Sequence, residues 1–216
     1  NTKYIIGNHA VKPYSIVPKT HIKITNPFQM MQRTINSIGI KSNIFSPKIY
    51  TSKHDSIRSR SILKANSLKD NNFVILICGS NKRGKNKRWG TENFNALAGL
   101  IQKKYRCKSV LIGGPDDMEE CLSISRNDKT IINLCNKTNL IELIEIFSNA
   151  KFIISNDTGT AHLASSTKTP MIVITGPTDP KKVKPFGKKI LALQANSKDM
   201  NGITPADILD NIIKIL

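Results

Sequence analysis

The sequence is poor in acidic residues, with 15 Asp and Glu against 33 Lys and Arg, and its formal net charge is +18. A basic surface attracts polyanions in general, whether nucleic acid, anionic lipid headgroups or phosphorylated glycolipids. Residues 1–72 hold 12 basic and 2 acidic side chains, residues 73–150 hold 12 and 8, and residues 151–216 hold 9 and 5. Because lysine is common throughout, the charge alone does not assign a function.

Aromatic residues are also few, with one Trp, four Tyr and seven Phe. They do not interleave with basic residues as base-stacking surfaces require, and no zinc-finger spacing or RNA-binding signature is present. The composition therefore disfavours specific nucleic-acid binding. A nucleic-acid binder stays open as an alternative, which a steep salt dependence of binding would reveal.

The four cysteines, Cys78, Cys107, Cys121 and Cys135, are widely spaced and have no Cys-x-x-Cys pair or nearby histidine. This spacing disfavours a zinc site and a disulfide framework, so we predict no metal site. Cys78 closes an apolar run and is expected in the core. Unpaired thiols fit a reducing cytoplasm.

No apolar run approaches the roughly 20 residues that span a bilayer. The chain begins with Asn1 and shows no charged-then-apolar leader, so we expect no secretory signal. We also expect that the chain is a fragment or that its upstream part is encoded elsewhere. Its 216 residues suffice for one large domain, or for one domain and part of another.

From residue 73 onward, apolar runs of strand length alternate with helix-length segments. The expected strands are 73–78, 109–112, 130–134, 151–155, 171–175 and 190–193, and the expected helices are 91–104, 116–125, 140–149 and one that starts at Thr204-Pro205. The runs are apolar on both faces, as strands covered on both sides require. Residues 73–216 therefore predict an α/β fold, a Rossmann-like doubly wound parallel sheet.

Residues 1–72 differ from this pattern. A helix is expected from Asn26-Pro27 with Phe28 on its apolar face and Gly39 at its end. Residues 50–70 are polar and charged, which is typical of an exposed linker or flexible loop. We therefore predict a remnant of a preceding lobe at residues 1–48, a polar linker at 49–72 and the sheet domain at 73–216.

The most informative segment is Ser155–Ala164, which follows one apolar run, while Gly176–Pro180 follows the next. Ligands of open α/β sheets bind at the carboxyl ends of the strands. A loop of Thr and Gly that opens onto a helix presents unpaired N–H groups, which suit a phosphate. Asp157 would then accept the amides of the loop or hold hydroxyls of an attached sugar. A cap that only shapes the turn is the alternative.

Six blocks of sequence carry a family resemblance: Asp157-Thr158-Gly159-x-x-His162-Leu163-Ala164, Thr169-Pro170, Gly176-Pro177-Thr178-Asp179-Pro180, Pro185-Phe186-Gly187, Lys87-Arg88-Trp89 and Gly113-Gly114-Pro115-Asp116-Asp117. In order and spacing they resemble glycosyltransferase family 9, the ADP-heptose:lipopolysaccharide heptosyltransferases. The last two look like the family's Lys-x-Trp-Pro and Gly-x-Pro-x-acid motifs. The resemblance covers residues 73–190 well and residues 1–40 more faintly.

The resemblance implies the C-terminal, donor-binding lobe of a GT-B glycosyltransferase with a remnant of the N-terminal acceptor lobe. It implies an inverting, metal-independent transfer of heptose from ADP-heptose, or a related nucleotide sugar, to the lipopolysaccharide inner core without a cofactor. The implied location is cytoplasmic, with peripheral contact to the anionic inner membrane, and no specific nucleic acid is implied as a partner.

Residue by residue, the resemblance implies catalytic roles for Lys87 and Asp157, with Lys87 at the donor diphosphate. The implied donor-binding residues are Ser80, Asp117, Thr138, Thr158, Gly159, Thr160 and His162. Two departures bear on Lys87: Gly90 replaces the family Pro, and the loop after Ser80 is longer, which makes Lys85 a possible substitute.

Simpler interpretations stay open for several of these residues. Asp117 also fits an acidic first helical turn, Thr138 a helix entry, and His162 a packing or hydrogen-bonding residue. The family's catalytic base lies in a Gly-Asp motif that residues 1–72 lack, because their only acidic residues are Asp55 and Asp70. A non-catalytic nucleotide-sugar-binding module is therefore the alternative function.

Overall fold

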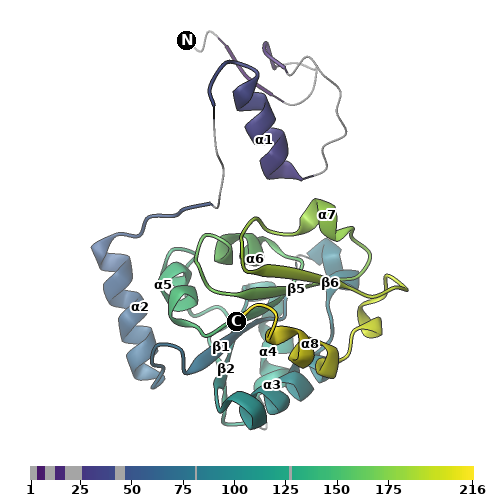
Figure 1. Cartoon of the computed structure of the whole chain (residues 1–216). Coiled ribbons are helices and arrows are strands. Elements are labelled where there is room, and N and C mark those ends of the chain that lie inside the picture. The colour runs from purple at the N-terminus through teal and green to yellow at the C-terminus, as the bar shows by residue number, and fades with distance from the viewer. Residues whose placement is uncertain (1–3, 8–12, 18–25, 42–46, 81, 127) are drawn as a thin grey trace.

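A computed structural model describes residues 4–7, 13–17, 26–41, 47–80, 82–126 and 128–216 (Figure 1). Its centre is one six-stranded sheet, made of β1 (Phe73–Ile77), β2 (Lys108–Ile112), β3 (Ile131–Asn133), β4 (Ile153–Asn156), β5 (Met171–Thr175) and β6 (Ile190–Gln194). The strand order is β3-β2-β1-β4-β5-β6, and every neighbouring pair is parallel. The predicted Rossmann-like parallel sheet is confirmed. The order reverses between β1 and β4, which places a ligand crevice at their carboxyl ends.

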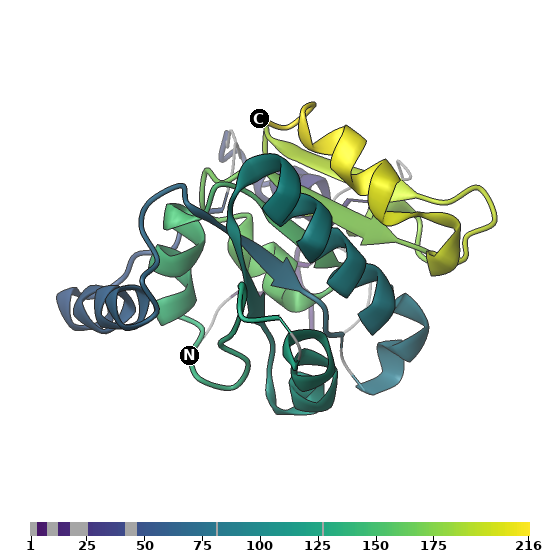
Figure 2. The same cartoon turned by 90° about the horizontal axis from the view of Figure 1, so that it is seen from below.

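Helices cover both faces of the sheet. One face carries α3 (Thr91–Tyr105), α4 (Met118–Ser125) and α8 (Pro205–Ile212), and Figure 2 shows α3 and α8 side by side. The other face carries α2 (Lys53–Ala65), α5 (Glu142–Asn149) and α6 (Gly159–Ala164). Alternate residues of each strand feed the two cores, so that Val74 and Leu76 belong to the first and Phe73 and Ile75 to the second. This explains why the runs are continuously apolar.

The remaining elements are α1 (Pro27–Asn36), η1 (Lys82–Lys87), η2 (Pro115–Asp117), α7 (Pro180–Val183) and η3 (Met200–Gly202). The expected strand 171–175 has the observed bounds, and the others differ by one or two residues at an end. The last helix ends at Ile212, before the C-terminus. None of the helices in the described ranges combines the length and apolar character that crossing a membrane requires.

The expectation of an exposed or flexible linker at residues 49–72 is wrong for its conformation, because this segment contains α2. Ser52 and Asp55 form a capping box at its start. Its Leu63 is buried in the second core, and the hydroxyl of the fully buried Ser59 donates to the carbonyl oxygen of Glu142 at 2.9 Å. The helix thus packs on the domain through Leu63 and on α5 through polar contacts.

Two ion pairs complete that interface. The Arg58 guanidinium contacts the Glu142 carboxylate, whose side chain is buried, and the Arg60 Nε atom lies 2.6 Å from Glu145 Oε1. Charged residues that suggested an unstructured segment therefore attach α2 to α5.

The N-terminal segment contains α1, which starts at the Asn26 cap as expected. In Figure 1, α1 lies apart from the sheet domain, on the side of α7. The Phe28 ring contacts that of Phe186, with centroids 5.5 Å apart. Closer to the N-terminus, Ile6 and Ile16 form an isolated bridge. The domain limits at residues 48 and 72 stay predictions.

Candidate functional site

The predicted site residues come from loops at the carboxyl ends of the strands. Ser80 and Lys87 follow β1, Asp117 follows β2, Asp157 follows β4, and Thr178 follows β5. Parallel strands bring these ends to one edge of the sheet, at the reversal between β1 and β4. The structure therefore gathers these residues at the carboxyl ends of the strands (Figure 1), and their binding roles stay predictions.

Lys87 and Asp157 form an ion pair, with Nζ 2.7 Å from Oδ2. The Thr178 hydroxyl donates to the same oxygen at 3.0 Å. The Asp157 side chain is 8% exposed and that of Lys87 is 30% exposed, so Lys87 is the more accessible member of the pair. The structure thus brings together the two residues predicted as catalytic, 70 positions apart in the chain.

Asp157 does not cap the helix that follows it. The N-cap of α6 is Thr158, whose side chain makes no capping hydrogen bond, and the Asp157 carboxylate accepts from two side chains instead of the loop amides. The expectation that Asp157 caps the turn or accepts its amides is therefore wrong.

The loop at residues 176–187 reaches this cluster through Thr178. Gln194 on β6 fixes it, because its Nε2 atom donates to the carbonyl oxygens of Gly176 at 2.8 Å and Thr178 at 2.9 Å. The backbone of Thr178, whose hydroxyl contacts Asp157, is therefore fixed by hydrogen bonds from Gln194.

A second polar cluster surrounds Arg88, a residue that the sequence reasoning did not select. The Arg88 Nη2 atom donates to Asp117 Oδ1 at 3.0 Å and to the Ser80 carbonyl oxygen at 2.9 Å. The Ser80 hydroxyl donates to the Gly84 carbonyl oxygen at 2.7 Å. Ser80 and Asp117, both predicted to bind the donor, are therefore joined through Arg88.

Asn156 is a further residue that sequence reasoning missed. Its side chain is fully buried, donates to the Cys78 carbonyl oxygen at 2.6 Å and accepts from the Trp89 N–H at 3.3 Å. The Trp89 indole N–H donates to the Ile203 carbonyl oxygen at 2.7 Å. Asn156 thus ties the loop of Lys87 to the ends of β1 and β4. The only signal was its place directly before Asp157.

Gly90, which departs from the family motif, is the N-cap of α3 and has φ +96° and ψ 149°. Proline is locked near φ −65° and L-residues avoid this region, so the observed backbone requires glycine. Despite that departure, Lys87 reaches Asp157. Lys85 is exposed, and its role as a substitute stays a prediction.

The first turn of α6 carries Thr158, Gly159 and Thr160, of which Gly159 is exposed. His162 lies one turn further and is half-buried. Burial lowers the pKa of His162, and the charge of Asp157 partly opposes this shift. The imidazole is therefore within electrostatic range of the Lys87 pair. The donor-binding roles of these four residues stay predictions.

Thr138 stands apart from these clusters, in the loop between β3 and α5. Asn139, directly after it, accepts from the backbone N–H groups of Ile141 and Glu142 with its side chain, as a helix-entry residue does. The four cysteines are free and buried, and Cys78 lies in the core as predicted.

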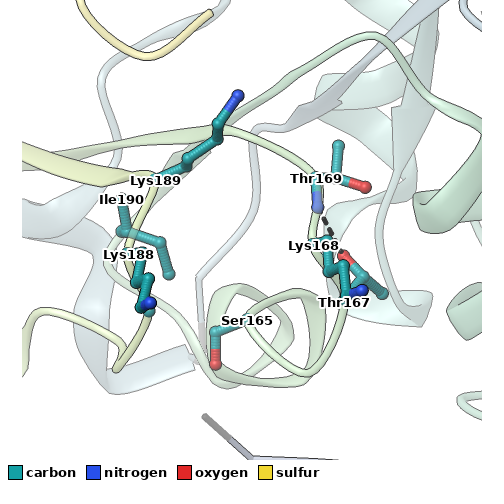
Figure 3. Close-up of a pocket in the computed structure, with 8 residues that line it drawn as sticks. Ser165, Thr167, Lys168, Thr169, Lys188, Lys189 and Ile190 are labelled. Atoms are coloured by element: carbon teal, nitrogen blue, oxygen red, sulfur yellow. Dashed lines mark hydrogen bonds between the residues drawn. The ribbon is translucent and has the colours of Figure 1, made fainter. Parts of the chain in front are cut away.

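A hollow of about 430 Å³ lies at the opposite edge of the sheet, before β5 and β6. Figure 3 shows Lys188 and Lys189 on one side of it and Lys168 on the other, with Ser165 below. It is lined by three lysines, three hydroxyl residues, Gly187 and Ile190, none of which was predicted as a catalytic or donor-binding residue. It belongs to the basic surface of the domain.

The comparisons with known proteins agree with this geometry. The model of glycosyltransferase family 9 (heptosyltransferase) matches residues 17–212. Lipopolysaccharide heptosyltransferase 1 of Escherichia coli O18:K1:H7 is 26% identical over 118 residues, which are 55% of this chain and 36% of that protein. The chain thus spans well under two thirds of this relative.

Two solved structures share the fold. A glycosyl transferase family 9 protein from Veillonella parvula superposes with a TM-score of 0.81 at 20% identity, over 94% of this chain and 62% of that one. The E. coli heptosyltransferase WaaC with ADP gives a TM-score of 0.72 at 19% identity, over 94% and 60%.

Proposed function

Since the chain belongs to glycosyltransferase family 9, we propose that it forms the donor-binding lobe of a heptosyltransferase that takes ADP-heptose or a related nucleotide sugar. The pairing of Lys87, Asp157 and Thr178 at the strand-order reversal carries this proposal. The relatives named for heptose transfer and for bound ADP support the choice of donor.

The proposed reaction is an inverting, metal-independent transfer to the lipopolysaccharide inner core at the cytoplasmic face of the inner membrane. As the glycosidic bond breaks, negative charge develops on the leaving diphosphate, and the Lys87 ammonium group stabilises it. Asp157 would repel a phosphate, so it keeps Lys87 in place or accepts a sugar hydroxyl. The start of α6 follows Asp157 directly, and its residues Thr158, Gly159 and Thr160 would contact the donor.

Calorimetric titration of ADP and ADP-heptose into the chain and into Lys87→Ala and Asp157→Ala tests the proposal. The chain is expected to bind both ligands, and each variant to lose about tenfold or more in affinity, ~1.4 kcal/mol. Lys103→Ala removes the same charge from an exposed position of α3 and should bind as the parent does. Binding of a random oligonucleotide in low salt, without binding of either nucleotide, would refute the proposal.

One observation favours the alternative function, a module that binds the nucleotide sugar and does not catalyse its transfer. Asp55, one of two acidic residues before residue 73, is used in the capping box of α2, where the Ser52 hydrogen bond lowers its pKa. A carboxylate that is hydrogen-bonded within a helix cap and has a lowered pKa is a poor general base. Release of ADP on adding acceptor to the ADP-heptose-bound chain would exclude this alternative.

A further inference from the structure

Arg88 is held by every nitrogen atom of its guanidinium group. Besides the bonds of Nη2 to Ser80 and Asp117, its Nε atom donates to the Ser80 hydroxyl at 3.3 Å, and its Nη1 atom lies 2.5 Å from Glu120 Oε2. The Arg88 side chain is 13% exposed. A planar fork with several donors suits this arrangement, whereas a lysine ammonium group could not reach all of these acceptors.

Asp117 is correspondingly confined. Its Oδ2 atom accepts from the Gly114 N–H at 2.9 Å, while Oδ1 accepts from Arg88. A Cβ atom at Gly79 would lie 2.1 Å from Asp117 Cγ, so the carboxylate lies directly against the backbone at the end of β1. Arg88 contributes a side-chain contact to this carboxylate, whereas Gly114 and Gly79 contact it through their backbone.

We propose that Arg88 is a positioning residue that orients the Asp117 carboxylate toward the ribose hydroxyls of the nucleotide donor. Through this orientation it sets the preference of the site for a ribose over a 2′-deoxyribose. The inference rests on the proposed function, because it takes the donor to be a nucleotide sugar with its ribose at Asp117.

Arg88 orients Asp117 without blocking it. Each carboxylate oxygen has two lone-pair sites, and the two observed hydrogen bonds use one on each oxygen. Arg88 contacts Glu120 as well as Asp117, so its positive charge is not neutralised by Asp117 alone. The Asp117 carboxylate can therefore still accept hydrogen bonds from a ligand. Burial lowers the pKa of Arg88, but Glu120, Asp117 and Asp116 together raise it above its usual value, so the group stays charged.

The role of Arg88 is separable from that of its neighbour. Lys87 turns toward Asp157 at the end of β4, whereas Arg88 turns toward Asp117 at the end of β2. Arg88 also lines a hollow of about 650 Å³ together with Lys85, Asp116, Glu119 and Glu120. In the family's Lys-x-Trp-Pro motif, Arg88 occupies the unspecified position. Because Arg88 contacts Asp117 and not Asp157, its replacement should change ribose recognition and leave the contact with the diphosphate unchanged.

The test compares ADP with 2′-deoxy-ADP by calorimetric titration of the full chain, Arg88→Gln, Arg88→Lys and Asp117→Asn. The parent should prefer ADP about tenfold. In Arg88→Gln the affinity for ADP should fall to that for 2′-deoxy-ADP, which should itself change little. Asp117→Asn should remove the same preference. The double variant Arg88→Gln/Asp117→Asn should lose no more affinity for ADP than either single variant, because both changes remove the same interaction.

Lys103→Gln, with the same loss of charge on α3, should keep the tenfold preference. An equal loss of affinity for both nucleotides in Arg88→Gln, or an unchanged ratio, would overturn the inference. If Arg88→Gln fails to fold, Arg88→Lys gives the same comparison with the charge retained. A parent that binds neither nucleotide would instead refute the proposed function, and the inference with it.

Discussion

At the scale of single residues, the site depends on contacts that local sequence does not encode. Lys87 and Asp157 could be selected because each lies in a recognisable motif after an apolar strand. Arg88 and Asn156 could not, since their roles arise only when segments 29 and 67 positions apart meet at the edge of the sheet. Motifs therefore identified the candidate site residues, while the residues that hold them needed the structure.

His162 should make the stability of the chain depend on pH. Because burial lowers its folded-state pKa, the unfolded chain binds more protons than the folded chain between the folded and unfolded pKa values. The free energy of unfolding should thus fall as the pH drops from above the usual histidine value, about 6.5, through the folded pKa. Thermal denaturation across this range should show a flatter profile for His162→Gln than for the parent.

His54, exposed on α2, is the matched position for that experiment. His54→Gln removes an exposed histidine and should keep the slope of the parent. Equal slopes in the parent and His162→Gln would mean that other groups produce the pH dependence.

At the scale of elements, Gly90 determines how α3 begins. Restoring the family Pro at this position should destabilise the chain by about 1–3 kcal/mol, because proline cannot adopt φ +96°. Gly99→Ala, in the exposed middle of α3 with no atom near its added methyl group, should stabilise by about 0.5–1 kcal/mol. Chemical denaturation measures both, and a Gly90→Pro variant as stable as the parent would contradict the argument.

The elements also show how far sequence patterns reach. Strands such as Met171–Thr175 were predictable because burial on both faces makes them continuously apolar. The order of the strands was not, since it depends on which helices pack on which face. Helix α2 was missed because its packing uses ion pairs with α5 and few apolar residues, although Ser52-x-x-Asp55 carried a capping signal.

At the scale of the whole molecule, the net charge is +18, and three of the lysines gather around the hollow of Figure 3. Lys168, Lys188 and Lys189 line it from two loops at the amino ends of β5 and β6. This edge is opposite the candidate site, so a surface that contacts these lysines would leave the site accessible. Near an anionic membrane each lysine contributes about 1 kcal/mol, which falls with increasing salt.

The chain should therefore sediment with vesicles that contain phosphatidylglycerol and not with vesicles of phosphatidylcholine alone. Changing Lys168, Lys188 and Lys189 together to Gln should weaken vesicle binding by about tenfold or more. Lys103, Lys104 and Lys129 give a control triple with the same loss of charge. If the two triple variants weaken equally, total charge governs binding and the position of the hollow does not matter. A selective loss in the first would show that this edge faces the membrane.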